Sequence, residues 1–118
     1  MIERFDTRPE LSQAVVFNGT IYLAGQVAQG HAGSPFAEQF QAILHRVDDL
    51  LALCGSDRTH MLNATIFLRS AEDYDAMNAL WKAWLGAAPS PARSTICGIE
   101  LALAGLDVEM TVVAGQGR

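Results

Sequence analysis

A chain of 118 residues with a net charge of −5 argues against several classes of function at once. Its eight lysines and arginines form no cluster, and phosphate neutralisation needs a positive stripe, so we expect no nucleic-acid partner. No apolar run approaches the length of a membrane span, and the amino terminus lacks the apolar core of a signal peptide, which favours a soluble, cytoplasmic protein without a membrane partner. The length suits a single domain over residues 1–118.

The first elements have the pattern of a β-hairpin. The apolar run from Leu11 to Phe17 leads into Asn18-Gly19, a two-residue turn signal, and a second strand is predicted over residues 20–27. A short strand over residues 2–5 is expected to precede them.

A long amphipathic helix is predicted next. Ser34 is the expected N-cap and Pro35 the first helical residue, where its missing amide hydrogen does no harm. Apolar residues then recur at helical spacing from Phe36 to the region of Gly55, and glycine suits the C-terminal end of a helix. A strand rich in β-branched and aromatic residues is predicted over residues 62–68.

A second helix and two strands complete the chain. Ser70 and Asp73 have the spacing of a capping box, and a second helix that ends at Gly86 is predicted after them. Its apolar face is formed by Tyr74, Met77, Trp81, Trp84 and Leu85. Two prolines then prevent the helix from continuing, and strands are predicted over residues 93–99 and 108–114.

These elements predict an α+β fold in which two helices pack on one face of a mixed sheet, since each helix has one apolar face and follows a strand. Half of the residues are hydrophobic, which is high for a small soluble domain. The apolar strand surface exceeds what two helices can cover, so we expect sheets from several subunits to pack together. The strand residues behind this expectation are Val15, Leu23, Ile66, Ile96, Met110 and Val112.

Two charged residues within apolar strand segments indicate a functional site. Arg93 presents a planar fork of donors that fits a carboxylate, so we expect a small acidic ligand. Glu109, between Val108 and Met110, is then expected to handle protons beside that ligand.

The cysteines and histidines indicate no metal site. Cys54 and Cys97 lack the paired spacing of a zinc site and are expected to be free thiols in apolar surroundings, with Cys97 buried and unreactive. The three histidines are scattered without metal-ligand spacing. We therefore expect neither a metal nor a thiol nucleophile.

Four segments, in this order, carry a resemblance to a known family: Gly25-Gln26, Asn78 within Tyr74–Asn78, Pro91–Ser94 and Val108–Met110. Together they span nearly the whole chain and resemble the RidA (YjgF) reactive-intermediate deaminases. The resemblance implies a chorismate-mutase-like fold assembled as a homotrimer, with ligand pockets in the clefts between subunits. It also implies hydrolysis of 2-aminoacrylate and related enamines or imines to 2-keto acids and ammonia, without a cofactor.

The same resemblance implies roles for individual residues. Arg93 would hold the substrate carboxylate, and Glu109 would position or activate water, so that these two are the expected catalytic residues. Gly25 and Asn78 match positions near the family pocket, and Thr95 is expected to line it with a hydroxyl group. These five residues form the predicted site.

Three positions depart from the family pattern. Leu11 stands where the family has a pocket tyrosine, Ala24 where it has a serine, and Thr95 where it has a cysteine. The pattern is therefore closer to divergent branches of the family than to its typical deaminases, and it leaves the substrate open.

The residues alone also fit simpler interpretations. Arg93 fits an ion pair at a strand end, Glu109 a solvent-facing strand residue, and Asn78 a helix-surface amide. The alternative function is a non-catalytic or regulatory trimer that binds a small carboxylate such as a 2-keto acid, because the three departures remove groups that the deaminases carry. Hydrolysis of another small amide or carbamate-like compound would use the same arginine and glutamate.

Overall fold

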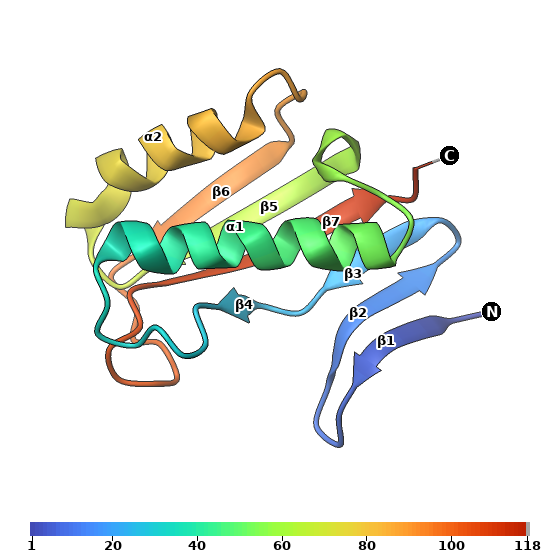
Figure 1. Cartoon of the computed structure of the whole chain (residues 1–118), viewed down its shortest axis with the longest axis horizontal. Helices are drawn as coiled ribbons and strands as arrows, with labels where there is room; N and C mark the ends of the chain where they lie inside the picture. The colour runs from blue at the N-terminus through green and yellow to red at the C-terminus, as the bar shows by residue number, and fades with distance from the viewer. Residues whose placement is uncertain (118) are drawn as a thin grey trace.

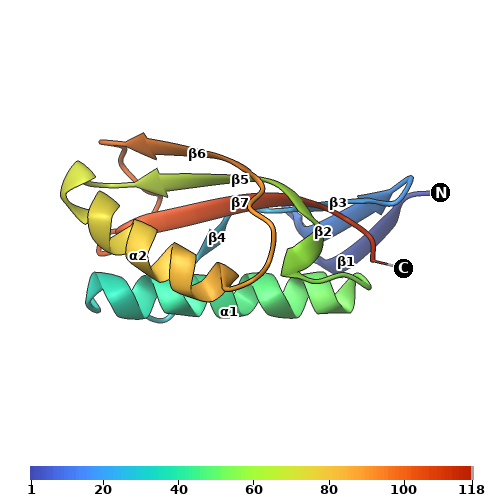
Figure 2. The ribbon, with the colours of Figure 1, turned by 90° about the horizontal axis from the view of Figure 1, so that it is seen from above.

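Seven strands form one twisted sheet, and two helices lie across a single face of it (Figure 1 and Figure 2). This computed structural model describes residues 1–117. The strands are β1 (Glu3–Thr7), β2 (Ser12–Phe17), β3 (Thr20–Leu23), β4 (Gln26–Val27), β5 (Met61–Leu68), β6 (Ala92–Cys97) and β7 (Val108–Gly115). The helices are α1 (Phe36–Leu53) and α2 (Tyr74–Leu85), and the single 3-10 turns η1 (Arg58–His60) and η2 (Ala71–Asp73) precede β5 and α2.

The sheet has the order β1-β2-β3-β7-β5-β6, with β4 also paired to β7, so that β1 and β6 form its opposite edges. All pairs are antiparallel except β5 and β6, which run parallel and are joined by the crossover through α2. The prediction of an α+β fold with two helices on one face of a mixed sheet is confirmed. The strand predicted over residues 93–99 is shorter and ends at Cys97, because Gly98 takes a positive φ of 79°.

The strand predicted over residues 20–27 is interrupted. β3 and β4 both pair with β7, but four residues of chain lead from Tyr22 to Gln26 while three lead between their partners on β7. The extra residue falls at Ala24 and Gly25, which belong to neither strand. Such an insertion re-aims the backbone at this point of the sheet, as a β-bulge does.

The buried side chain of Gln26 explains this interruption. Its amide nitrogen donates to Gln13 Oε1 and to the Ala24 carbonyl, each at 2.9 Å. Its amide oxygen accepts from Arg46 Nε on α1, also at 2.9 Å. A buried amide must find such partners, and here they tie the interrupted strand to the helix layer.

The start of α1 differs from the prediction. Pro35 is the N-cap residue and the helix begins at Phe36, without a side-chain cap. In the first turn of α1, the amide nitrogen of the buried Gln39 donates to the carbonyls of Ser34 and Gly105, each at 3.0 Å. Gln39 thereby holds the loop that leads into β7 against the first turn of α1.

The predicted capping box at the second helix is only half formed. Ser70 Oγ accepts from the backbone amide of Glu72 at 3.1 Å, but this bond caps η2 rather than α2. Asp73, the other member of the box, makes no side-chain cap bond, and α2 begins at Tyr74. The short 3-10 turn has taken the place of the first helical turn.

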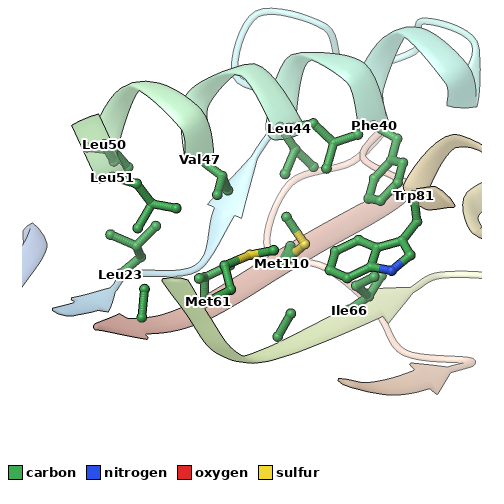
Figure 3. Close-up of a cluster of buried hydrophobic side chains, with 14 of the residues drawn as sticks. Leu23, Phe40, Leu44, Val47, Leu50, Leu51, Met61, Ile66, Trp81 and Met110 are labelled. Carbon is green, nitrogen blue, oxygen red and sulfur yellow. The ribbon is translucent and has the colours of Figure 1, made fainter. Parts of the chain in front are cut away.

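The hydrophobic core lies between the sheet and the two helices (Figure 3). Each helix is apolar on one side only, and this side faces the sheet. No helix within residues 1–117 is long and apolar enough to cross a membrane. Figure 3 shows side chains from both layers meeting in this core: Leu23, Phe40, Leu44, Val47, Leu50, Leu51, Met61, Ile66, Trp81 and Met110.

No element of the described chain, residues 1–117, covers the opposite face of the sheet (Figure 2). Six apolar strand residues were expected to be more than two helices can cover. Four of them are buried beneath the helices, namely Leu23, Ile66, Met110 and Val112, whereas Val15 and Ile96 lie on the uncovered side. We call this side the open face. Its apolar side chains include Val15, Tyr22, Phe67, Ile96 and Val113, of which Tyr22 is 49% exposed and Ile96 43% exposed.

Candidate functional site

Arg93 lies on the edge strand β6 and points beneath α2. Its Nη1 donates to Asn78 Oδ1 at 2.8 Å, and its Nη2 donates to Tyr74 Oη at 3.4 Å. The guanidinium carbon lies 5.4 Å from the centroid of the Trp81 ring. These three partners stand at positions i, i+4 and i+7 of one helix, so a single helical face holds the arginine in place.

The partners of Arg93 are all neutral. Its guanidinium group is half-buried and forms no ion pair with any residue of the described chain, 1–117. By contrast Arg58 pairs with Asp48, and Arg69 pairs with Asp107. A guanidinium ion keeps its charge inside a protein, so Arg93 retains an unneutralised positive charge with donors to spare for an anion. Within one subunit, the simple interpretation of a strand-end ion pair is wrong.

Thr95 stands two residues after Arg93 on β6, and its side chain therefore points to the same side of the sheet. Its Oγ1 is buried and has no hydrogen-bond partner within residues 1–117. A buried hydroxyl without a partner costs about 1–3 kcal/mol, which makes this group a donor available beside the arginine.

The two thiols lie in different surroundings. Cys54 is buried as expected, and burial raises the pKa of its thiol. Cys97, predicted to be buried, is exposed in the subunit because it ends an edge strand. Apolar neighbours in the sequence do not indicate burial of Cys97, because its position at the end of the edge strand β6 decides its exposure.

Glu109 and Gly25 form a second cluster. Glu109 pairs with Val27 of β4 and Phe67 of β5, and its side chain lies on the open face of the sheet. A methyl group on Gly25 would overlap the carboxylate oxygen of Glu109 and would stand 3.0 Å from its carboxyl carbon. The interruption after β3 thus brings a residue without a side chain next to the carboxylate.

The two clusters lie on opposite faces of one subunit. Arg93 pairs with Ala64, which is fully buried beneath the helices, whereas Glu109 pairs with Phe67 on the same strand β5. Positions three apart on a strand face opposite sides. Arg93 and Glu109 therefore lie on opposite sides of the sheet within one chain. Arg93, Asn78 and Thr95 make one half of the predicted site, and Gly25 with Glu109 makes the other.

The departures from the family pattern are spread over the sheet. Leu11 is exposed in the turn between β1 and β2, at the far edge from β6 (Figure 1). Ala24 adjoins Gly25, and its carbonyl accepts from the Gln26 amide. Sequence reasoning missed Tyr74, whose hydroxyl contacts Arg93. The available signal is the spacing of four residues between Tyr74 and Asn78, which places both side chains on one face of a helix.

The surface hollow between the two helices lies away from both clusters. A hollow of about 420 Å³ lies between α1 and α2, and neither Arg93 nor Glu109 lines it. Within the described part of the chain, no group of three or more histidine, cysteine, aspartate or glutamate residues is arranged to hold a metal ion. The chemistry of the two clusters therefore rests on a guanidinium ion, a carboxylate and neutral hydrogen-bonding groups.

Comparisons with known proteins give the context of this geometry. The family model described as endoribonuclease L-PSP matches residues 1–116. The RutC family protein YoaB of Escherichia coli is 37% identical over 95 residues, which cover 80% of this chain and 82% of that protein. A goat protein (Capra hircus) named 2-iminobutanoate/2-iminopropanoate deaminase is 30% identical over 111 residues, which cover 90% of this chain and 80% of that protein.

A solved structure is similar over the whole chain. The crystal structure of a member of the YjgF protein family from Neisseria meningitidis superposes with a TM-score of 0.93 at 39% identity. The likeness covers 100% of this chain and 97% of that one.

Proposed function

Because the chain belongs to the RidA (YjgF) family, we propose that it is a deaminase that hydrolyses small 2-imino acids and their enamine tautomers to 2-keto acids and ammonia without a cofactor. The observation that carries this proposal is the half-buried Arg93, held by Asn78, Tyr74 and Trp81 and lacking a carboxylate partner within residues 1–117. Such an arginine is prepared for a small carboxylate ligand.

The names of the relatives support the class of reaction and not its substrate. The goat relative is named for 2-iminobutanoate and 2-iminopropanoate, whereas YoaB has only a family name. The family description refers to an endoribonuclease, but a net charge of −5 without a basic cluster does not suit an RNA substrate. The arginine favours a ligand with a single carboxylate.

We propose that the complete site forms between subunits of a homotrimer. The half with Arg93 lies at the edge strand β6 and under α2, while the half with Gly25 and Glu109 lies on the open face. Packing the edge of one subunit against the open face of a neighbour would bring the halves together and bury apolar side chains such as Tyr22 and Ile96. Light scattering should then give about three times the 12.7 kDa of one chain.

In the proposed reaction, Arg93 binds the carboxylate of the imino acid through parallel charge-assisted hydrogen bonds. Glu109 of the adjacent subunit accepts a proton from a water molecule as the water oxygen adds to the imine carbon. Glu109 passes this proton to the imine nitrogen, which then takes up a second proton from the added hydroxyl group. The carbon–nitrogen bond breaks, and ammonia leaves as the carbon–oxygen double bond of the 2-keto acid forms. General acid–base assistance of this kind contributes about a hundredfold to ten-thousandfold in rate.

The test is the decay of 2-iminopropionate generated by an amino-acid oxidase. Purified protein should accelerate this decay, and Arg93→Ala should reduce the rate to that without protein, because the substrate carboxylate loses its partner. Lys82→Ala is the matched control, since it removes one positive charge from an exposed position on α2 and should leave the rate unchanged. Equal rates for wild type and Arg93→Ala would contradict the proposed function.

A second candidate is a non-catalytic trimer that binds a 2-keto acid. The observation in its favour is that Leu11 and Ala24 lack the hydroxyl groups, and Thr95 the thiol, that related deaminases carry at these positions. Calorimetric binding of 2-oxobutanoate without any acceleration of imine decay would select this function. Acceleration of the decay would exclude it.

A further inference from the structure

We propose that the Tyr74 hydroxyl donates a hydrogen bond to the carboxylate held by Arg93. The inference rests on the proposed function only in that the ligand is a 2-imino acid or the corresponding 2-keto acid. It assigns a further ligand-binding residue on the same subunit as the arginine.

The hydrogen-bond geometry leaves the Tyr74 proton free. Arg93 has no acceptor atom, so in their 3.4 Å contact its Nη2 donates and the phenol oxygen accepts. The phenol is both a donor and an acceptor, and its own hydrogen is left without an acceptor in this contact. A carboxylate on the outer side of the guanidinium group would be reached by the arginine and the phenol together.

The exposure of Tyr74 separates this role from core packing. Its side chain is 39% exposed, whereas Met77 and Trp81 on the same helix are buried. Tyr74 is the first residue of α2, four positions before Asn78, so both side chains lie on the face that contacts Arg93. The exposed phenol of Tyr74, beside the Arg93 guanidinium group, can contact a ligand that the buried ring of Trp81 cannot reach.

Tyr74 and Arg93 belong to the same chain, and their contact joins α2 to β6. The phenol therefore approaches the carboxylate from the arginine side, and its contact does not depend on a neighbouring chain.

The first experiment compares wild type with Tyr74→Phe, which removes only the hydroxyl and keeps the ring. Loss of one hydrogen bond to a charged group should raise the Kd for 2-oxobutanoate about tenfold in calorimetry. For imine hydrolysis, KM should rise while kcat changes little, because the hydroxyl binds the carboxylate and takes no part in proton transfer. Circular dichroism should show an unchanged fold. An unchanged Kd would overturn the inference.

A second experiment observes the phenol directly. The chain has two tyrosines, so the ring-carbon resonances of tyrosine labelled with carbon-13 at Cζ can be assigned by comparing wild type with Tyr74→Phe. Saturation with 2-oxobutanoate should shift the Tyr74 resonance, because its hydroxyl gains a charged acceptor. Binding seen by calorimetry without such a shift would also overturn the inference.

The outcomes separate the two proposals. If wild type hydrolyses the imine and Tyr74→Phe has the same KM and Kd, the role of Tyr74 is wrong and the proposed function stands. If wild type binds 2-oxobutanoate without hydrolysis and Tyr74→Phe binds it more weakly, the deaminase function is wrong and the role of Tyr74 stands. If wild type neither binds nor hydrolyses, both are wrong.

Discussion

At Gly25, a single hydrogen in place of a side chain decides where the Glu109 carboxylate lies. The glycine has no positive φ that would require it, so its backbone conformation is open to other residues. Space is the constraint, because a methyl group there would overlap the carboxylate oxygen. A side chain introduced at Gly25 would therefore first meet Glu109, one of the two proposed catalytic residues.

Gly25→Ala should lower kcat for imine hydrolysis by about a hundredfold, since displacement of a catalytic group by about 1 Å has effects of this size. The stability should change little, because the flexible Glu109 side chain can move away on the open face. Steady-state kinetics and thermal unfolding would measure both quantities. Gly115→Ala is the matched control, as its methyl group would meet no atom closer than 3.9 Å. A normal kcat for Gly25→Ala would show that the position of Glu109 does not matter.

At the scale of elements, α2 contacts Arg93, and its N-terminal end with the preceding turn η2 carries a group of acidic residues. The helix holds Arg93 through Tyr74 and Asn78, while its N-terminal end carries acidic side chains close together. Burial, followed by repulsion from Asp107 and Glu72, raises the pKa of Asp73 above its ordinary value. The charged form of Asp73 is therefore less favourable in the folded chain than in the unfolded chain.

This raised pKa gives the sign of a pH effect on stability. The folded chain binds the Asp73 proton more tightly, so this contribution to stability is full below the unfolded pKa and is lost as the pH rises through the folded pKa. Asp73→Asn should therefore increase the free energy of unfolding at pH 7 relative to its effect at acidic pH. Urea unfolding at both pH values checks this, and a gain that is larger in acid would contradict it.

Helices and turns could be predicted from sequence because their signals are local. The apolar spacing gave α1 and α2, and Asn18-Gly19 gave the hairpin. The interruption at Ala24 and Gly25 was missed because it depends on contacts of Gln26 with Arg46 and Gln13, which are distant in sequence. The predicted Ser34 cap does not form, because Pro35 takes the N-cap position and α1 begins at Phe36 without a side-chain cap.

The candidate site was predicted in its members but not in its arrangement. Arg93, Asn78, Thr95, Gly25 and Glu109 each lie in one of the two clusters, and their roles stay predictions. Whether Arg93 and Glu109 share a face depends on how β6 and β7 are each registered against β5. The loop between the two strands hides this relation, because its length does not fix the register.

At the scale of the whole molecule, Arg93 and Glu109 lie on opposite faces of the sheet, which leads to a prediction about trimers that mix two variants. Arg93→Ala and Glu109→Gln should each be inactive alone. When equal amounts are unfolded together and refolded, an interface that takes its arginine from one variant and its glutamate from the other is intact. Random assembly of a cyclic trimer should make about a quarter of the sites intact, and activity should return to about that fraction of wild type.

The control for mixing is to combine the two variants after separate refolding, without subunit exchange, which should remain inactive. Refolded mixtures that stay inactive would place both residues of each site in the same subunit, or would exclude one of them from the site. Mass spectrometry under native conditions would verify that mixed trimers have formed.

In the proposed assembly, the placement of Arg93 and Glu109 on opposite faces would also link catalysis to protein concentration. A newly made chain that has folded correctly, with its core buried, would carry two incomplete halves and no working centre. In the proposed assembly, activity begins only when chains meet, so specific activity per chain should fall on dilution while circular dichroism stays constant. Isolated subunits would be folded but inert, and assembly itself would act as the step that switches the enzyme on.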